Sequence, residues 1–150
     1  MSIEFQIDSN EIEATIERIA RQLPEINRRA KLRTGLALAQ DAVNQSPTPP
    51  VATGYLRGSW FVAIENKSVE TGKTGHKGSV PTGPDIIVGF SAAYAAKMHE
   101  GFGRMTPGRF SQQAGNTGPK FLELKLINNR ARYMGIYADT FRDAIEDAYG

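Results

Sequence analysis

A proline-rich stretch one third of the way along the chain constrains the fold more than any other feature. In SPTPPVATG, residues 46–54, three prolines occupy four consecutive positions. Proline has a fixed φ and no backbone N–H, so this stretch can neither continue a helix nor form a central strand. It is predicted to be a connector between a helical segment, residues 9–44, and the remainder, residues 55–150.

The segment before the connector has helical periodicity. Asp8 or Ser9 can cap a helix by accepting an orphan backbone N–H. Pro24 predicts a break or a kink, because its ring clashes with the preceding turn. Six basic residues between Arg18 and Arg33 predict either a solvated polar face or a contact with an acidic partner. The apolar positions at helical spacing are Ile12, Ile16, Ile19, Ala20 and Leu23, then Ala30, Leu32, Leu36, Ala39 and Val43.

Two strands are predicted after the connector, at Ser59 to Glu65 and at Asp85 to Phe90. Both have apolar residues at odd and even positions, which indicates burial on both faces. Between them, residues 66–84 are rich in Gly, Ser, Thr and Lys, and a second such stretch covers residues 101–118. Both are predicted to be long flexible basic loops that become ordered on contact with a partner.

The chain is predicted to become helical again from Pro119, with apolar residues at helical spacing as far as Ala148. Acidic residues in the last turn lie at the negative end of the helix dipole, which predicts either fraying or a basic neighbour there. The pattern as a whole predicts a single α+β domain, residues 1–150. A small, mainly antiparallel sheet would be packed by a long N-terminal helical segment and a C-terminal helix.

Composition excludes several classes of function. The 150 residues contain no cysteine, which removes disulfides and thiolate chemistry. We expect neither a secretory signal nor a membrane span, and hence a cytosolic protein or a particle assembled in the cytosol. The net charge of +2 is small for a free-standing nucleic-acid binder, although residues 66–120 carry a local excess of +4.

Three short motifs do not support an enzyme or a cofactor. GKTGHKG, residues 72–78, lacks the glycine that a phosphate loop needs five positions earlier, and GFG, residues 101–103, lacks the third glycine of a dinucleotide fingerprint. His99 and Glu100 are an adjacent imidazole and carboxylate, but neighbouring side chains diverge, so we expect a structural histidine at a strand or turn. Zinc is disfavoured because His76 lies in a predicted loop. No cofactor, no metal and no catalytic activity are predicted.

Three segments together resemble a family of minor virion proteins of long-tailed bacteriophages, the tail-completion or neck proteins, also described as head-tail joining or minor capsid proteins. ATGYLRGSW (residues 52–60) is similar to its "TG-x-L-R-x-S" entry into the first strand. DIIVGFSAAYAAKMHEGFG (residues 85–103) is similar to its "V-G … YA" segment, and GPKFLE (residues 118–123) to its "PFL" helix start. The order and spacing of the three segments carry the resemblance, which covers residues 52–145.

The residues in these segments have plausible physical roles. Glycine can turn the chain at a positive φ, and tyrosine combines an apolar ring with a polar tip that suits a subunit boundary. The predicted structural positions are Thr53, Gly54, Leu56, Gly101, Gly103, Pro119, Phe121 and Leu122. The predicted contacts with subunits or partners are Arg57, Tyr94, His99, Glu100, Arg104 and Arg109.

The resemblance implies a structural protein of the virion that forms a ring, commonly of six copies, between the head connector and the tail tube. DNA would pass through the lumen without sequence-specific binding. A tail terminator or a head-closure protein of the same region is an alternative. A nucleic-acid-binding module that uses residues 18–33 and the basic loops is an alternative of another class, and its affinity would depend strongly on salt.

Overall fold

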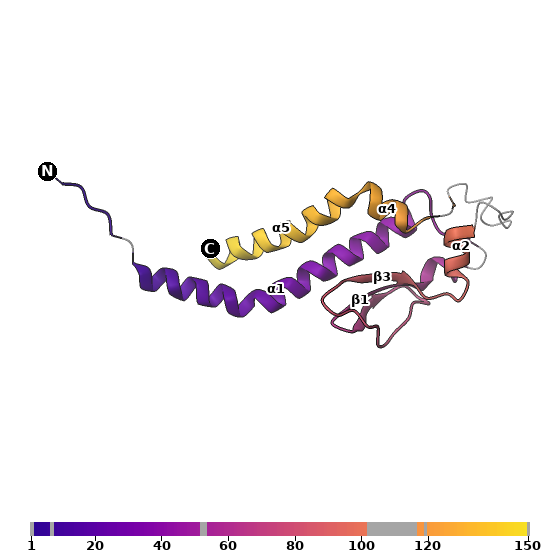
Figure 1. The fold of residues 1–150 in the computed structure, drawn as a ribbon, viewed down its shortest axis with the longest axis horizontal. Helices are drawn as coiled ribbons and strands as arrows, with labels where there is room; N and C mark the ends of the chain where they lie inside the picture. Colours follow the sequence, from indigo (N-terminus) through magenta and orange to yellow (C-terminus); the bar gives the residue numbers. More distant parts are fainter. Residues whose placement is uncertain (1, 7, 52–53, 102–116, 119, 150) are drawn as a thin grey trace.

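The protein has an elongated α+β fold (Figure 1). The computed structural model describes residues 2–6, 8–51, 54–101, 117–118 and 120–149. Along these residues the order is α1 (Ser9–Asn44), a 3-10 turn η1 (Arg57–Ser59), β1 (Trp60–Ile64), β2 (Lys67–Thr71), β3 (Ile87–Phe90), α2 (Ala95–Gly101), α4 (Glu123–Asn128) and α5 (Arg130–Tyr149). The predicted α+β architecture is confirmed.

Helix α1 runs without interruption for 36 residues. It begins where the side chain of Asp8 accepts a hydrogen bond of 2.9 Å from the backbone N–H of Asn10. Of the break or kink predicted at Pro24, the break is wrong, because Pro24 lies inside the helix, and the kink stays a prediction. A proline removes one backbone hydrogen bond, and the remaining bonds and the packing of the following turns keep the helix continuous, although Figure 1 shows that α1 bends along its length.

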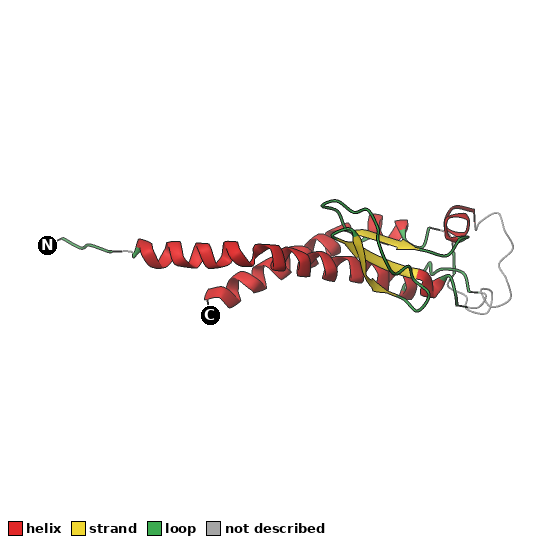
Figure 2. Cartoon of the chain, turned by 90° about the horizontal axis from the view of Figure 1, so that it is seen from below, coloured by secondary structure: helices red, strands yellow, loops and turns green. Residues whose placement is uncertain are grey.

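The sheet lies at one end of the molecule, beside α1 (Figure 2). Its order is β2-β1-β3, and β1 pairs with both neighbours in antiparallel register, for example Val62 opposite Val88. Because β1 is central, its residues Val62, Ala63 and Ile64 are completely buried. The two predicted strands are therefore confirmed, and burial on both faces is confirmed for β1, whereas the residues of β3 are half-buried.

Strand β2 lies within residues 66–84, where the sequence predicted only a loop, and this part of the prediction is wrong. Glu65 and Asn66 have φ values of 52° and 65°, so they form a tight turn of the kind that favours a two-residue hairpin. The polar side chains of β2 concealed it, because an edge strand can be held by backbone hydrogen bonds to its neighbour without a continuous apolar face.

Helix α5 packs along α1 and joins it through buried polar contacts. Asp41 of α1 is buried and accepts a hydrogen bond of 2.8 Å from the Tyr133 hydroxyl and one of 3.1 Å from Arg132 Nε. Nearer the C-terminus of α5, the Tyr137 hydroxyl donates to Asn27 Oδ1. These contacts fix the register of the two helices.

The connector is held by cationic side chains. Its prolines supply carbonyl acceptors but no N–H donors. Arg57 Nη2 donates to Thr48 Oγ1 at 3.0 Å and to the Pro49 carbonyl at 3.3 Å. Lys125 of α4 is buried, and its Nζ donates to the carbonyls of Pro47 at 2.5 Å and Phe121 at 2.9 Å.

Candidate functional site

The three segments that carry the sequence resemblance meet at one end of the molecule. Leu56 from the first segment is buried with Ala92 and Ala95 from the second. The Phe121 ring of the third segment, which is only 1% exposed, makes edge-to-face contacts with Phe90 at 5.1 Å and with His99 at 5.0 Å between ring centroids. We call this contact region the motif junction, defined by Leu56, Phe90, Ala95, His99 and Phe121.

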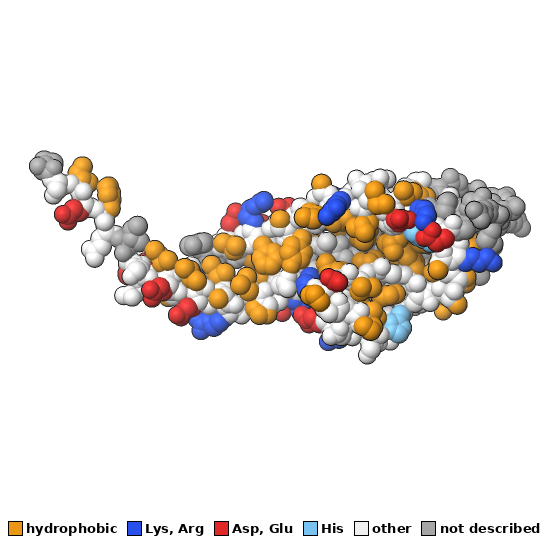
Figure 3. Space-filling view, in the orientation of Figure 1, with side chains coloured by type: hydrophobic (Ala, Val, Ile, Leu, Met, Phe, Trp, Pro, Cys, Tyr) orange, Lys and Arg blue, Asp and Glu red, His pale blue; other side chains and the backbone are white. Residues whose placement is uncertain are grey.

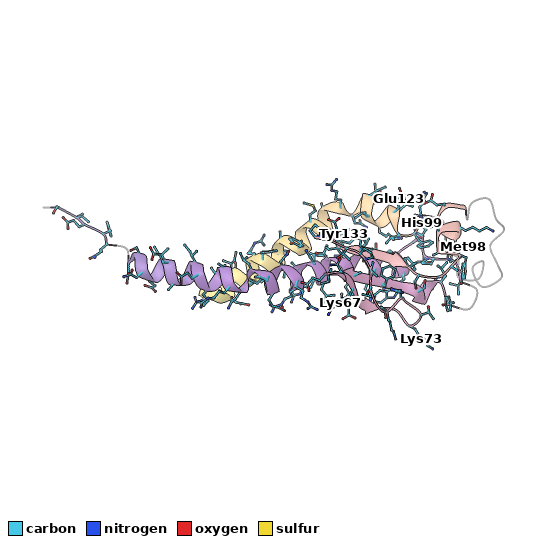
Figure 4. The ribbon with its side chains drawn as sticks, turned by 60° about the horizontal axis from the view of Figure 1, so that its bottom comes forward. Lys67, Lys73, Met98, His99, Glu123 and Tyr133 are labelled. Atoms are coloured by element: carbon cyan, nitrogen blue, oxygen red, sulfur yellow. The ribbon has the colours of Figure 1, made fainter. Side chains whose placement is uncertain are left out.

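The motif junction includes the histidine that the sequence singled out. His99 lies on α2 and not on the predicted strand or turn, so that prediction is wrong. Its Nε2 accepts a hydrogen bond of 3.3 Å from the backbone N–H of Glu123, which leaves the ring proton on Nδ1, where it donates to Glu100 Oε1 at 2.9 Å. The divergence expected for the adjacent residues His99 and Glu100 is also wrong, because their side chains are hydrogen-bonded to each other. Figure 4 shows that His99 lies near Glu123 at the start of α4.

The ammonium group of Lys120 lies between the carboxylates of Glu100 and Glu123. Lys120 Nζ forms an ion pair with Glu100 Oε2 and lies 3.1 Å from Glu123 Oε2. The hydrogen bond from Lys120, followed by that from His99, lowers the pKa of Glu100, and the same bond to Glu100 raises the pKa of Lys120. The charges are exposed, so they stabilise the contact only modestly.

The ligand atoms of His99, Glu100 and Glu123 lie within 4.8 Å of one another, which is close enough to surround a metal ion. The nitrogen atoms of His99 are already used by a backbone donor and a carboxylate acceptor. Lys120 supplies the positive charge between the two carboxylates. The side chains of His99, Glu100, Lys120 and Glu123 form a clasp that joins α2 to α4.

The clasp also includes a backbone contact between α2 and the residues before α4. Besides the side chains, the backbone N–H of Lys120 donates to the His99 carbonyl at 2.9 Å. A pocket of about 260 Å³ opens beside the clasp, with walls formed mainly by Phe90, Ala95, Phe121 and Leu122. Its walls are mainly apolar, and His99 and Glu100 lie at its polar edge.

The other predicted contact residues have different environments. Tyr94 is 42% exposed, next to the motif junction, and its environment suits a subunit boundary. Arg57 is used within the chain to hold the connector, and its predicted contact with a neighbouring subunit stays a prediction. Arg104 and Arg109 lie outside the described residues.

Several predicted structural residues have the expected positions. Gly54 has a φ of +83°, which glycine adopts without strain. Leu56 and Phe121 are buried in the core, Leu122 is half-buried and Gly101 is the last residue of α2. Thr53, Gly103 and Pro119 lie outside the described residues.

The sequence did not identify the residues that contact His99 and Glu100, nor the buried polar residues of the helices. Lys120 and Glu123 were not singled out from the sequence. Lys120 precedes the predicted helix and Glu123 lies in its first turn, next to Phe121, and these positions could have identified both residues as candidates. Asp41, Lys125 and Tyr133 have no such signal, because polar residues at helical positions look the same in the sequence whether they are buried or exposed.

Comparison with known proteins found no matching family model, no matching curated protein and no matching solved structure. Among the described residues, no helix is both long enough and apolar enough to span a membrane.

Proposed function

We propose that this chain is a structural component of the head-to-tail neck of a tailed bacteriophage. It assembles into a ring, hexameric in the family that it resembles, which completes the tail and joins it to the head connector. Its partners are further copies of itself, the connector or adaptor on the head side, and the tail tube or tail terminator. DNA passes through the lumen, and the chain carries out no catalytic step.

The observation that carries this proposal is the motif junction. The three segments that resemble the neck family are separated by long stretches of sequence, yet their residues pack on one another through Leu56, Ala95, His99 and Phe121. Resemblances produced by chance would have no reason to coincide in space. Their contact therefore supports treating them as one inherited structural unit.

The chemistry of the motif junction also supports a mechanical role. The charged groups of Glu100, Lys120 and Glu123 are engaged with one another, and His99 is engaged through its ring nitrogens. A group that acts on a substrate must be within reach of it and able to exchange a proton. Here the polar groups hold two helices together, beside an exposed Tyr94 and an apolar pocket that suit contact with another protein.

The proposal is tested by removing the gene from the phage or prophage that carries it and inducing particle formation. We expect DNA-filled heads and separate tails in electron micrographs, and joined virions when the wild-type gene is supplied in trans. Joined, infectious particles in the absence of the gene would refute the neck role. Micrographs of complemented particles that carry a tagged chain distinguish tail completion from a tail terminator or a head-closure protein.

The nucleic-acid alternative has a separate test. Binding of labelled DNA is measured at low and moderate salt, because binding through phosphates weakens steeply as salt rises. We expect no sequence-specific binding. Tight, salt-sensitive binding by the isolated chain would favour the alternative.

A further inference from the structure

The N-terminal part of α1 carries an apolar stripe that its own chain does not cover. Ile12, Ile16 and Leu23 are 47%, 59% and 41% exposed, and Ile19 is half-buried. Figure 1 shows α1 extending beyond the C-terminal end of α5, and Figure 3 shows apolar side chains along this projecting part. We call residues 9–23 the α1 tip.

The stripe has the geometry of a helix interface. Its positions, spaced by four and three residues, continue in the same phase to Ile26 and Ala30, which are buried where α5 packs along α1. Such spacing keeps apolar side chains on one side of a helix that faces a partner. The stripe thus continues an interface that is formed within the chain and extends past the end of α5.

A second uncovered apolar surface lies at the end of the molecule that contains the sheet, which we call the body. A groove of about 500 Å³ between α1, β3 and α4 is lined by Gly35, Leu38, Ile87, Val88, Leu122 and Leu126. Leu126 on its rim is 49% exposed. We call this surface the β3–α4 groove, and the apolar side chains around it are visible in Figure 3.

The α1 tip cannot fill the groove of its own chain. Ile16 and Gly35 lie on the same helix, 19 residues apart, which corresponds to about 28 Å along the axis. The bend in α1 does not fold the tip back over the sheet (Figure 1). An occupant with the shape of the α1 tip must therefore come from another molecule.

Charge favours a second copy of this chain as that molecule. Residues 2–23, which include the α1 tip, contain five acidic residues and two basic ones, Arg18 and Arg21. The body that contains the groove has a small basic excess, since its described residues 54–101, 117–118 and 120–128 contain seven basic and five acidic residues. Complementary potentials favour docking of the acidic end on the basic body and oppose a parallel pairing of two acidic tips.

We infer that the α1 tip of one copy binds in the β3–α4 groove of the next copy. The two contacting surfaces differ, so a pair of bound copies leaves one tip and one groove available. A contact of this kind generates a closed ring, or an open filament when the rotation does not close. The inference rests on the proposed ring and supplies its subunit contact.

The contact is tested with one substitution on each surface and a matched control. Ile16→Glu places a charge in the centre of the stripe, and Leu126→Glu places a charge on the rim of the groove. Ala14→Glu adds the same charge to an exposed position of α1 outside the stripe. Mass is measured by light scattering after size-exclusion chromatography, and circular dichroism checks that each variant folds.

We expect the wild type and Ala14→Glu to assemble, with a hexamer near about 98 kDa, six times the 16.4 kDa of one chain. Ile16→Glu and Leu126→Glu should each weaken self-association by about tenfold or more, since each buries a charge at the contact. Mixing these two variants should restore a dimer and nothing larger. One intact tip and one intact groove remain in the mixture, and they belong to different chains.

Other outcomes overturn the inference. A wild type that stays monomeric shows that the two surfaces do not bind each other. Normal assembly of Leu126→Glu, without rescue of Ile16→Glu on mixing, shows that the tips pair with one another. A ring that survives both substitutions removes this contact but leaves the neck proposal standing, and that proposal depends on the gene-deletion phenotype instead.

Discussion

The backbone N–H of Lys120 donates a hydrogen bond of 2.9 Å to the carbonyl oxygen of His99, across 21 positions of sequence. Together with the Lys120–Glu100 ion pair, this bond brings the end of α2 next to the start of α4. Both contacts are made by α2 residues at or next to His99, which belongs to the motif junction.

Phe121 is expected to contribute most of the apolar packing in the motif junction. Phe121→Ala should lower the free energy of unfolding by about 3–5 kcal/mol, because the ring is buried against Phe90 and His99. Ile127→Ala is the control, since Ile127 is 63% exposed and its loss should change stability by less than about 0.5 kcal/mol. Urea denaturation measures both. Equal effects of the two substitutions would contradict the anchoring role.

The contact between Glu100 and Lys120 is expected to depend on pH. The pKa of Glu100 is lowered, so its contribution is present above the ordinary value of 4.5 and is lost as the pH falls through the lowered value. Glu100→Gln should reduce the melting temperature at neutral pH, and the difference from wild type should shrink below pH 4.5. Glu70→Gln, at an exposed position of β2, serves as the control. A difference that is constant from pH 7 to pH 3 would argue against this ion pair.

Two glycines in helices should respond in opposite directions to alanine. A Cβ at Gly35 would lie 2.6 Å from Val62 Cγ1, so Gly35→Ala should destabilise the protein by about 1–3 kcal/mol through overpacking of the contact between helix and sheet. A Cβ at Gly135 would meet nothing within 4 Å, and Gly135→Ala should stabilise α5 by about 0.5–1 kcal/mol. Denaturation midpoints of the two variants provide the comparison. Stabilisation by both would show that α1 does not approach β1 this closely.

Tyr133 is expected to ionise later than an ordinary tyrosine. Burial, then its hydrogen bond to Asp41, raises its pKa from 10.0 to about 12. Its contribution to stability is therefore present below pH 10.0 and is lost as the pH rises from there to 12. The difference in absorbance at 295 nm between wild type and Tyr133→Phe should titrate near pH 12, while circular dichroism shows that the chain is folded. A midpoint near 10 in the folded protein would mean that the Asp41 contact is absent.

Much of the fold followed from local patterns in the sequence. The apolar alternation that ends in Ile64 predicted the central strand, and the prolines of residues 46–54 predicted the connector, because both effects act over a few neighbouring residues. The break that was one of two alternatives at Pro24 does not occur, and the prediction of a loop failed at β2. A helix continues through a proline when its other turns are well packed, and an edge strand is held by the neighbouring strand rather than by its own apolar face.

The sequence also pointed to Tyr94, His99 and Glu100, but it gave them the wrong local structure. Whether adjacent side chains converge depends on what else is near them, and their partners Lys120 and Glu123 are 20 or more positions away. Contacts over such distances depend on how α2 and α4 pack. The spacing of residues within α2 or within α4 does not predict these contacts.

By itself, the sequence determined the strands β1 and β3, the helical character of residues 9–44 and of the C-terminal segment, and the connector, since each depends on residues close together in the chain. Only the tertiary structure decided that the three resembling segments form one junction, that Asp41 and Lys125 are buried, and that the apolar stripe of α1 extends past α5. Burial and exposure are set by which elements pack together. The same isoleucine spacing gives a covered face at Ile26 and an uncovered one at Ile16 because α5 ends between them.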